Sequence, residues 1–299
     1  MASRLKRFGA DMSLLAVAIV WGSTFLIVQD AIKQTPVYTF LFWRFLLAAV
    51  LMAVFSVKHI QALDKRTLFA GFVLGAFLFL GYVFQTFGLV YTYSSTVGFI
   101  TGLNVVIIPF VLLIIFRKKV SFYSCAGAIA AALGLYFLSA NAHVGMGKGE
   151  FYAFICAVMF SLQIVFTGFY TNKHDTHSLV FVQFCAVSVF CFFGIFALNN
   201  PLLPPTFDSL FIKAVVITSV FATVFAFFIQ TAMQKFTSSA KTAIIFTCEP
   251  VAAGVVGYFF ANEAFTPAQF VGAVLIIIGM LAAEIGEYAV KKIKTLFCR

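Results

Sequence analysis

Charged side chains are scarce in this chain of 299 residues, where Asp, Glu, Lys and Arg together make up 10% of the sequence. Hydrophobic residues account for 63%, and the mean hydropathy is +1.05. Average soluble domains carry charge on about a quarter of their residues, so this composition excludes a pair of soluble domains. It predicts a polytopic integral membrane protein with the lipid bilayer as its main surroundings.

Acidic residues are the scarcer sign of charge, with 10 Asp and Glu against 20 Lys and Arg. In a soluble protein, a net charge of +10 would suggest a nucleic-acid partner. Here the basic residues lie in short connections between apolar runs, which is the pattern that sets membrane topology. We therefore expect no nucleic-acid partner.

Histidine and cysteine are too few and too scattered to indicate metal or catalytic chemistry. The six cysteines fall mostly inside apolar runs, without the paired spacing of a disulfide framework or a zinc site. His174, Asp175 and His177 share one connection, but no further Cys or His lies near them. The sequence also lacks a GxxxxGK phosphate loop. We expect no metal, no cofactor and no ATP hydrolysis, and we disfavour a membrane-embedded enzyme.

Apolar runs long enough to cross a bilayer recur along the whole chain. A requirement of about 20 apolar residues per span predicts ten helices, at 11–29, 36–57, 68–91, 94–116, 121–140, 149–170, 177–198, 209–233, 238–260 and 266–288. Lys and Arg gather in alternate connections and at the C-terminus. The positive-inside rule then places both termini in the cytoplasm, and we expect the bacterial plasma (inner) membrane.

The two halves of the chain resemble each other. Residues 84–100 align without gaps with residues 229–245, so that Gln85 falls on Gln230, and the same register sets Gly134 on Gly279. Because each copy has an odd number of helices, the second copy must enter the membrane from the opposite side. The sequence thus predicts an all-α membrane protein of ten transmembrane helices, arranged as two inverted five-helix repeats over residues 11–140 and 149–288.

Glu249 is an acid in the middle of the apolar run 238–260, beside Pro250. An ionisable side chain at the centre of a span costs about 2.5 to 3.5 kcal/mol for Asp, Arg or Lys, so such residues usually face a cavity or a partner. Proline removes a backbone donor and tends to bend the helix. Arg44 is predicted at a comparable depth in the second span. The alignment pairs Glu249 with Asn104 and Arg44 with Gln183, so each pair has one charged and one neutral member.

Two interpretations of these charges stay open. Arg44 and Glu249 could form an ion pair that fixes their helices in register, or they could face a central cavity and contact a substrate or a coupling ion. A proton is the natural coupling ion for a carboxyl in an apolar span, since burial favours the neutral form, and a zwitterion would suit two opposite charges. The predicted site comprises Glu249, Arg44, Trp21, Thr24, Gln85, Asn104, Gln163 and Gln230.

The order of several motifs resembles a known family. They are WGSTF at 21–25, FWRFLLA at 42–48, STVGFITGLNVVIIP at 95–109, the Glu-Pro pair at 249–250 and Asn262 with Glu263. Together they resemble the drug/metabolite transporter superfamily, in its EamA-type ten-helix branch. The family usually carries an acidic residue after the fourth helix, where this chain has Arg117, Lys118 and Lys119.

The resemblance implies a secondary transporter that moves small molecules by alternating access, as a monomer or a homodimer. Export of amino acids or other small metabolites is the expected function, with a proton as the candidate coupling ion. Uptake of a small metabolite or an organic cation is the alternative. A channel fits less well, because filters are usually built by the symmetry of an oligomer.

Overall fold

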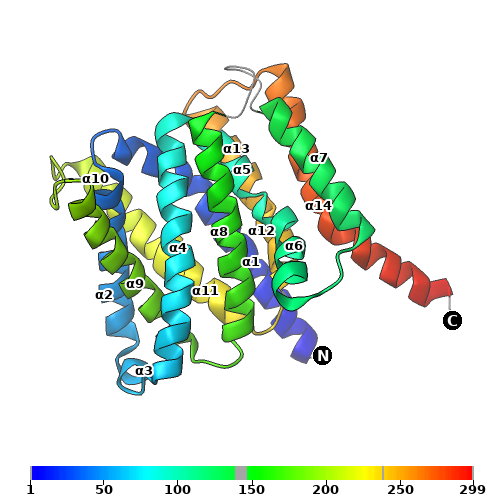
Figure 1. Cartoon of the computed structure of the whole chain (residues 1–299), viewed down its shortest axis with the longest axis horizontal. Helices are drawn as coiled ribbons and strands as arrows, with labels where there is room; N and C mark the ends of the chain where they lie inside the picture. The colour runs from blue at the N-terminus through cyan, green and yellow to red at the C-terminus, as the bar shows by residue number, and fades with distance from the viewer. Residues whose placement is uncertain (1, 139–146, 238, 298–299) are drawn as a thin grey trace.

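The computed structural model describes residues 2–138, 147–237 and 239–297, and these residues fold almost entirely into helices (Figure 1). The first half contains α1 (Ala2–Ile32), α2 (Val37–Phe55), α3 (Val57–Gln61), α4 (Lys65–Tyr91), α5 (Ser94–Thr101), α6 (Asn104–Phe116) and α7 (Phe122–Leu138). The second half contains α8 (Lys148–Tyr170), α9 (Thr176–Ala197), α10 (Ser209–Ile217), the π-helix η1 (Thr218–Phe225), α11 (Ala226–Met233), α12 (Ser239–Phe246), α13 (Cys248–Phe260) and α14 (Pro267–Phe297). The predicted all-α class is confirmed.

Every predicted span has a helical counterpart. Within the described residues, seven helices are long and apolar enough to cross a membrane, and shorter apolar helices cover Phe122–Leu138, Cys248–Phe260 and Pro267–Ala282. The helices extend beyond the first and last predicted spans, since α1 begins at Ala2 and α14 reaches Phe297. An apolar-length criterion detects only the part of a helix that lies in hydrocarbon, and a helix can continue beyond it through polar residues.

Three of the spans are divided into segments. Gly102 and Leu103 separate α5 from α6, and Thr247 separates α12 from α13. The second division agrees with the bend expected at Pro250, since proline is tolerated in the first turn of a helix but cannot donate to the preceding turn. The third divided span is α10–η1–α11, whose central segment is π-helical.

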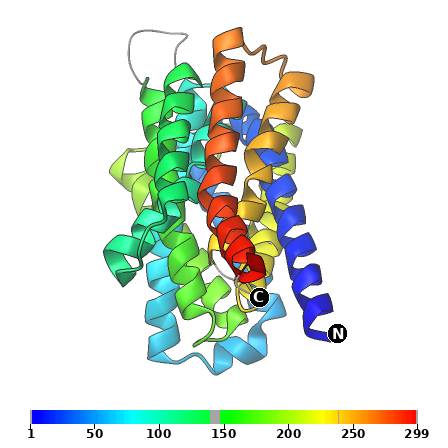
Figure 2. The same ribbon diagram turned by 90° about the vertical axis from the view of Figure 1, so that its right-hand side faces the viewer.

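The segments pack into a bundle with a helix pair at its side. In the bundle, α4 contacts α8 and α9, α2 contacts α9, and α1 and α5 contact α13. The pair is α7 with α14, which lie side by side at one edge of the molecule (Figures 1 and 2). A Cβ added to Gly134 would lie 2.7 Å from the Gly272 carbonyl oxygen, and one added to Gly279 would lie 2.6 Å from that of Gly127. The glycines therefore serve close packing within the chain.

At the end of the bundle that carries α3, polar contacts join the two halves. His59 lies 3.2 Å from a carboxylate oxygen of Asp175 and stacks on His177 at 4.2 Å between ring centroids. Asp175 caps α9 by accepting a hydrogen bond from the Ser178 amide. Burial alone would raise the pKa of Asp175, but the Ser178 hydrogen bonds and the two histidines lower it below its ordinary value of 3.8.

At the opposite end, one buried acid joins the two halves. The Glu263 carboxylate accepts hydrogen bonds from the Ser94 amide at 3.0 Å, the Ser94 hydroxyl at 2.6 Å and the Ser95 amide at 3.1 Å. These groups form the start of α5, where amides without helical partners attract a negative charge. Glu263 therefore ties the connection between α13 and α14 to the first half.

Candidate functional site

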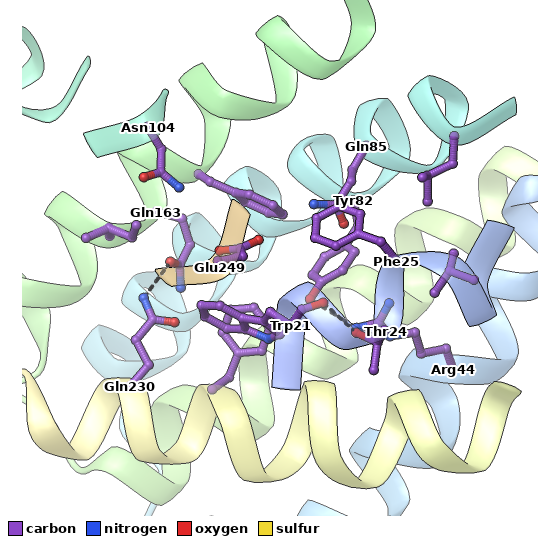
Figure 3. Close-up of a pocket in the computed structure, with 15 residues that line it drawn as sticks. Trp21, Thr24, Phe25, Arg44, Tyr82, Gln85, Asn104, Gln163, Gln230 and Glu249 are labelled. Atoms are coloured by element: carbon purple, nitrogen blue, oxygen red, sulfur yellow. Dashed lines mark hydrogen bonds between the residues drawn. The ribbon is translucent and has the colours of Figure 1, made fainter. Parts of the chain in front are cut away.

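A cavity lies at the centre of the bundle (Figure 3). Its volume is about 40 Å³, which is room for a few water molecules. The lining residues are Trp21, Thr24, Phe25, Val28, Arg44, Tyr82, Gln85, Leu89, Asn104, Phe160, Gln163, Ile164, Phe227, Gln230 and Glu249. The structure thus brings every residue of the predicted site to one cavity.

Both halves of the chain build this cavity. The first half contributes lining residues from α1, α2, α4 and α6, and the second half contributes them from α8, α11 and α13. Asn104 is the first residue of α6 and Glu249 the second of α13, so the two aligned residues lie at corresponding places in the divided spans.

Glu249 is buried without a protein partner. Glu249 is 4% exposed. Its carboxyl group has no hydrogen bond and no ion pair with any described residue. Figure 3 shows its carboxyl group among the lining side chains, between Gln163 and Trp21. A buried carboxylate needs a proton, a cation or a set of donors to offset its desolvation. The cavity is the place from which such a group can come.

Arg44 is held by neutral groups instead of by Glu249. Its Nε donates to the Thr223 hydroxyl at 2.9 Å, and its Nη2 donates to the Tyr82 hydroxyl at 3.0 Å. The guanidinium carbon lies 4.4 Å from the centroid of the Tyr82 ring. The direct ion pair between Arg44 and Glu249, one of the two interpretations of the sequence, is therefore not formed in this structure.

A chain of buried amides supports one side of the cavity. Gln230 Nε2 donates to Gln163 Oε1 at 3.1 Å, and Gln163 Nε2 donates to Gln183 Oε1 at 3.2 Å. Gln183, which the alignment pairs with Arg44, is fully buried behind the lining. The oxygens Gln230 Oε1 and Asn104 Oδ1 are buried without a donor among the described residues. Together with the Glu249 carboxyl, this side of the cavity offers oxygen acceptors and would suit a ligand with N–H groups.

Aromatic rings form much of the remaining wall. The Trp21 indole donates to the Ala222 carbonyl oxygen at 2.8 Å, and its ring centroid lies 5.2 Å from that of Phe227. Phe160 packs edge-on against Tyr82 at 5.3 Å between centroids. Sequence reasoning missed Tyr82, Phe160 and Phe227. In a chain with 41 Phe and 10 Tyr, nothing in the pattern distinguishes rings at the cavity from rings that face lipid.

The described residues contain no group of three or more His, Cys, Asp or Glu side chains that could hold a metal ion. The chemistry on offer is one cation, one acid, several amides and aromatic faces. This set can bind a small polar molecule among largely buried side chains. It has no nucleophile paired with a base in the cavity.

Comparisons with known proteins identify the family of this chain. The sequence profile of the EamA-like transporter family matches residues 9–140 and again residues 147–283. An uncharacterized transporter from Archaeoglobus fulgidus is 31% identical over 289 residues, which cover 95% of this chain and 88% of that relative. The uncharacterized transporter YetK from Bacillus subtilis is 24% identical over 297 residues, with 94% and 88% covered.

A solved crystal structure has the same fold. It superposes with a TM-score of 0.68 over 93% of this chain and 96% of the other, at 17% sequence identity. The family profile spans most of the chain, and the described helices are those of an integral membrane protein. This chain therefore belongs to the EamA-like transporter family.

Proposed function

We propose that the central cavity is the substrate site of a secondary transporter and that the substrate is a small zwitterion such as an amino acid. The observation that carries this proposal is the separation of the two buried charges. Arg44 and Glu249 both line the cavity, and they do not pair with each other. A molecule with a carboxylate and an ammonium group would offset both desolvation costs at once.

The two sides of the cavity suit the two ends of such a molecule. Glu249, Asn104 and Gln230 offer oxygen acceptors to an ammonium group. Arg44 uses Nε and Nη2 on Thr223 and Tyr82, so Nη1 keeps its two N–H groups for a carboxylate. The rings of Trp21 and Phe227 would enclose the apolar part of the substrate.

The size of the cavity supports alternating access. About 40 Å³ holds a few waters but not an amino acid, so the helices must move apart before a substrate can bind. The divided spans α5–α6 and α12–α13 carry Asn104 and Glu249 at their breaks, where rocking of one half against the other would change the site. Glu249 would then gain a proton or a substrate contact in one orientation and lose it in the other.

The direction of transport is proposed from the family resemblance. We propose export, with both termini in the cytoplasm, and a proton taken up by Glu249 as the coupling ion. In this orientation the α3 end of the bundle faces the cytoplasm, and Glu263 lies at the outer end. The positive-inside distribution of Lys and Arg supports that placement.

A counterflow assay tests the substrate class. Purified protein in liposomes loaded with unlabelled compound would be offered the labelled form of zwitterionic amino acids, primary amines and monocarboxylates in turn. We expect accumulation of at least one zwitterion, and its loss in Arg44→Gln and in Glu249→Gln. If no small solute accumulates with the wild-type protein, the proposed substrate class is wrong.

An organic cation is the second candidate, because the unpaired Glu249 carboxyl lies beside aromatic faces of Trp21 and Phe227. The same assay separates the two substrates. A cation-specific transporter would accumulate amines, and it would keep that activity in Arg44→Gln, because a cation does not need the guanidinium.

A further inference from the structure

A π-helical segment lies in the middle of one membrane span and touches two residues of the cavity. η1 covers Thr218–Phe225, between α10 and α11. π-Helical turns are rare and frequently lie at functional sites. The corresponding span of the first half, α4, is a continuous α-helix from Lys65 to Tyr91. The π-helix is therefore a specific property of the second half.

Three hydrogen bonds connect η1 to the cavity residues. Thr223 accepts from Arg44 Nε at 2.9 Å, Ser219 donates to the Arg44 carbonyl oxygen at 2.8 Å, and the Ala222 carbonyl accepts from the Trp21 indole at 2.8 Å. One short segment thus holds the side chain and the backbone of Arg44, and also the ring of Trp21.

The hydroxyl of Thr223 is itself oriented by the π-helix. It donates to the carbonyl oxygen of Thr218, five residues earlier, at 2.8 Å. A hydroxyl has one hydrogen to donate, so its lone pairs are left for Arg44 Nε. Three polar residues of η1 are fully buried, namely Thr218, Ser219 and Thr223. The result is a directed relay from Arg44 Nε through Thr223 to the backbone of η1.

We propose that Thr223 is a positioning residue of the transport site: η1 and Thr223 fix the Arg44 guanidinium so that its Nη1 presents two N–H groups to the anionic end of the substrate. This inference rests on the proposed function of the cavity. With Nε and Nη2 occupied by Thr223 and Tyr82, the fork of the guanidinium has one defined orientation. Loss of the Thr223 contact frees one of these two restraints.

Substitution of Thr223 by valine removes the hydroxyl and keeps the shape of the side chain, and Thr223→Ser restores the hydroxyl. In Thr223→Val we expect KM for the zwitterion found by counterflow to rise at least about tenfold, as for loss of a hydrogen bond to a charged group. The maximal rate should stay within about twofold, because Glu249 and the moving helices are unchanged. Thr223→Ser should return KM to near the wild-type value.

Thr167→Val is the matched control. Thr167 is also fully buried, and its hydroxyl has no partner among the described residues. The same chemical change there removes no hydrogen bond, so KM should not move. A rise in KM with Thr167→Val equal to that of Thr223→Val would overturn the proposal, since it would show a general effect of altered packing.

A second measurement needs no substrate and therefore separates this inference from the proposed function. In protein labelled with ¹⁵N-arginine, the Arg44 Nε–H resonance, assigned by its loss in Arg44→Lys, should exchange slowly with solvent deuterium. We expect at least about tenfold faster exchange in Thr223→Val and protection in Thr223→Ser and Thr167→Val.

Unchanged protection in Thr223→Val contradicts the relay. Faster exchange with an unchanged KM contradicts the role of the relay in transport. If the wild-type protein carries no zwitterion, the proposed substrate is wrong, and the exchange rates still decide whether Thr223 positions Arg44.

Discussion

The two halves of this transporter share a scaffold but differ at the residues that face the cavity. The scaffold is symmetric where backbones touch, since Gly134 and Gly279 are aligned and each packs against a carbonyl of the opposite helix. The cavity is asymmetric, because the aligned pairs are Arg44 with Gln183 and Glu249 with Asn104. Each half supplies one charge, and its partner position in the other half is a neutral amide.

The difference teaches that the repeat preserves positions while the chemistry at them diverges. Gln183 lies behind the lining and accepts a hydrogen bond from Gln163, whereas Arg44 lies at the cavity and is held by Thr223 and Tyr82. Among the described residues, the π-helix lies in the second half, and its Thr223 holds Arg44 of the first half. Two similar halves can rock against each other to open on either side of the membrane, and an asymmetric site between them can bind a substrate in one orientation.

The largest expected effect comes from Glu249→Gln, which leaves a neutral amide at both positions of the aligned pair Glu249 and Asn104. Transport of the zwitterion should fall at least about 100-fold, because a charge-assisted contact of up to about 3 kcal/mol is lost with the proton site. Initial rates in liposomes, with and without an imposed pH gradient, provide the measurement. Wild-type rates that keep their dependence on the gradient would exclude Glu249 from coupling.

Arg44→Gln places a glutamine at both positions of the other aligned pair, Arg44 and Gln183. We expect KM for the zwitterion to rise about 10- to 100-fold, in line with about 1.5 to 3 kcal/mol for a hydrogen bond to a charged group. Arg44→Lys should recover only part of this loss, because a lysine cannot reproduce the fork of contacts to Thr223 and Tyr82. A wild-type KM in Arg44→Lys would show that a positive charge is enough and that the geometry of the guanidinium is unimportant.

Alanine at either aligned glycine tests the symmetric scaffold. A Cβ on Gly134 would meet Ile276 N at 2.7 Å, and one on Gly279 would meet Ala131 N at 2.8 Å. Each substitution should destabilise the protein by about 1 to 3 kcal/mol through overpacking, and the two losses should be similar. Thermal unfolding in detergent measures both. Gly9→Ala is the control, since a Cβ there has nothing within 4 Å.

Glu263→Gln removes an acid that has no acidic counterpart in the first half. The carboxylate accepts three hydrogen bonds from Ser94 and Ser95, and the amide can replace only part of them. We expect a loss of about 1 to 2 kcal/mol in unfolding free energy. A loss in Glu150→Gln as large as this would argue against a special role for Glu263, since Glu150 accepts a hydrogen bond from the Thr92 hydroxyl instead of the three that Glu263 accepts.

The smallest effect should come from Asp175, which joins the halves at the α3 end. Asp175→Ala should cost about 1 kcal/mol for the lost helix cap, and Asp175→Asn less, because asparagine also caps. The pKa of Asp175 is lowered in the folded protein, so its charge stabilises the fold above about pH 3.8 and this contribution is lost as the pH falls further. Unfolding measured at pH 7 and at pH 3 should show a larger gap between wild type and Asp175→Asn at pH 7 than at pH 3.

The sequence predicted the all-α fold and the polar residues that line the cavity, because both leave strong local signals. A long apolar run indicates a transmembrane span, and a charged residue inside that run indicates a cavity or an oppositely charged partner. Each predicted site residue, from Trp21 in α1 to Glu249 in α13, lines the cavity.

The missed features depend on packing and not on composition. The partners of Arg44 are Thr223, distant in sequence, and Tyr82, one aromatic residue among many. The π-helix was not predicted from the sequence; in the structure it packs against α1 and α2. The sequence predicts that Arg44 and Glu249 need partners, but only the structure shows that they do not form an ion pair with each other.

The position of Trp21 makes the site optically observable. The chain has two tryptophans, and the other, Trp43, donates to the Leu202 carbonyl near the end of the bundle. With Trp43→Phe, all indole fluorescence would come from the wall of the cavity. Water that reaches the ring as the helices separate would shift its emission to longer wavelength, so opening could be followed in real time in unlabelled protein.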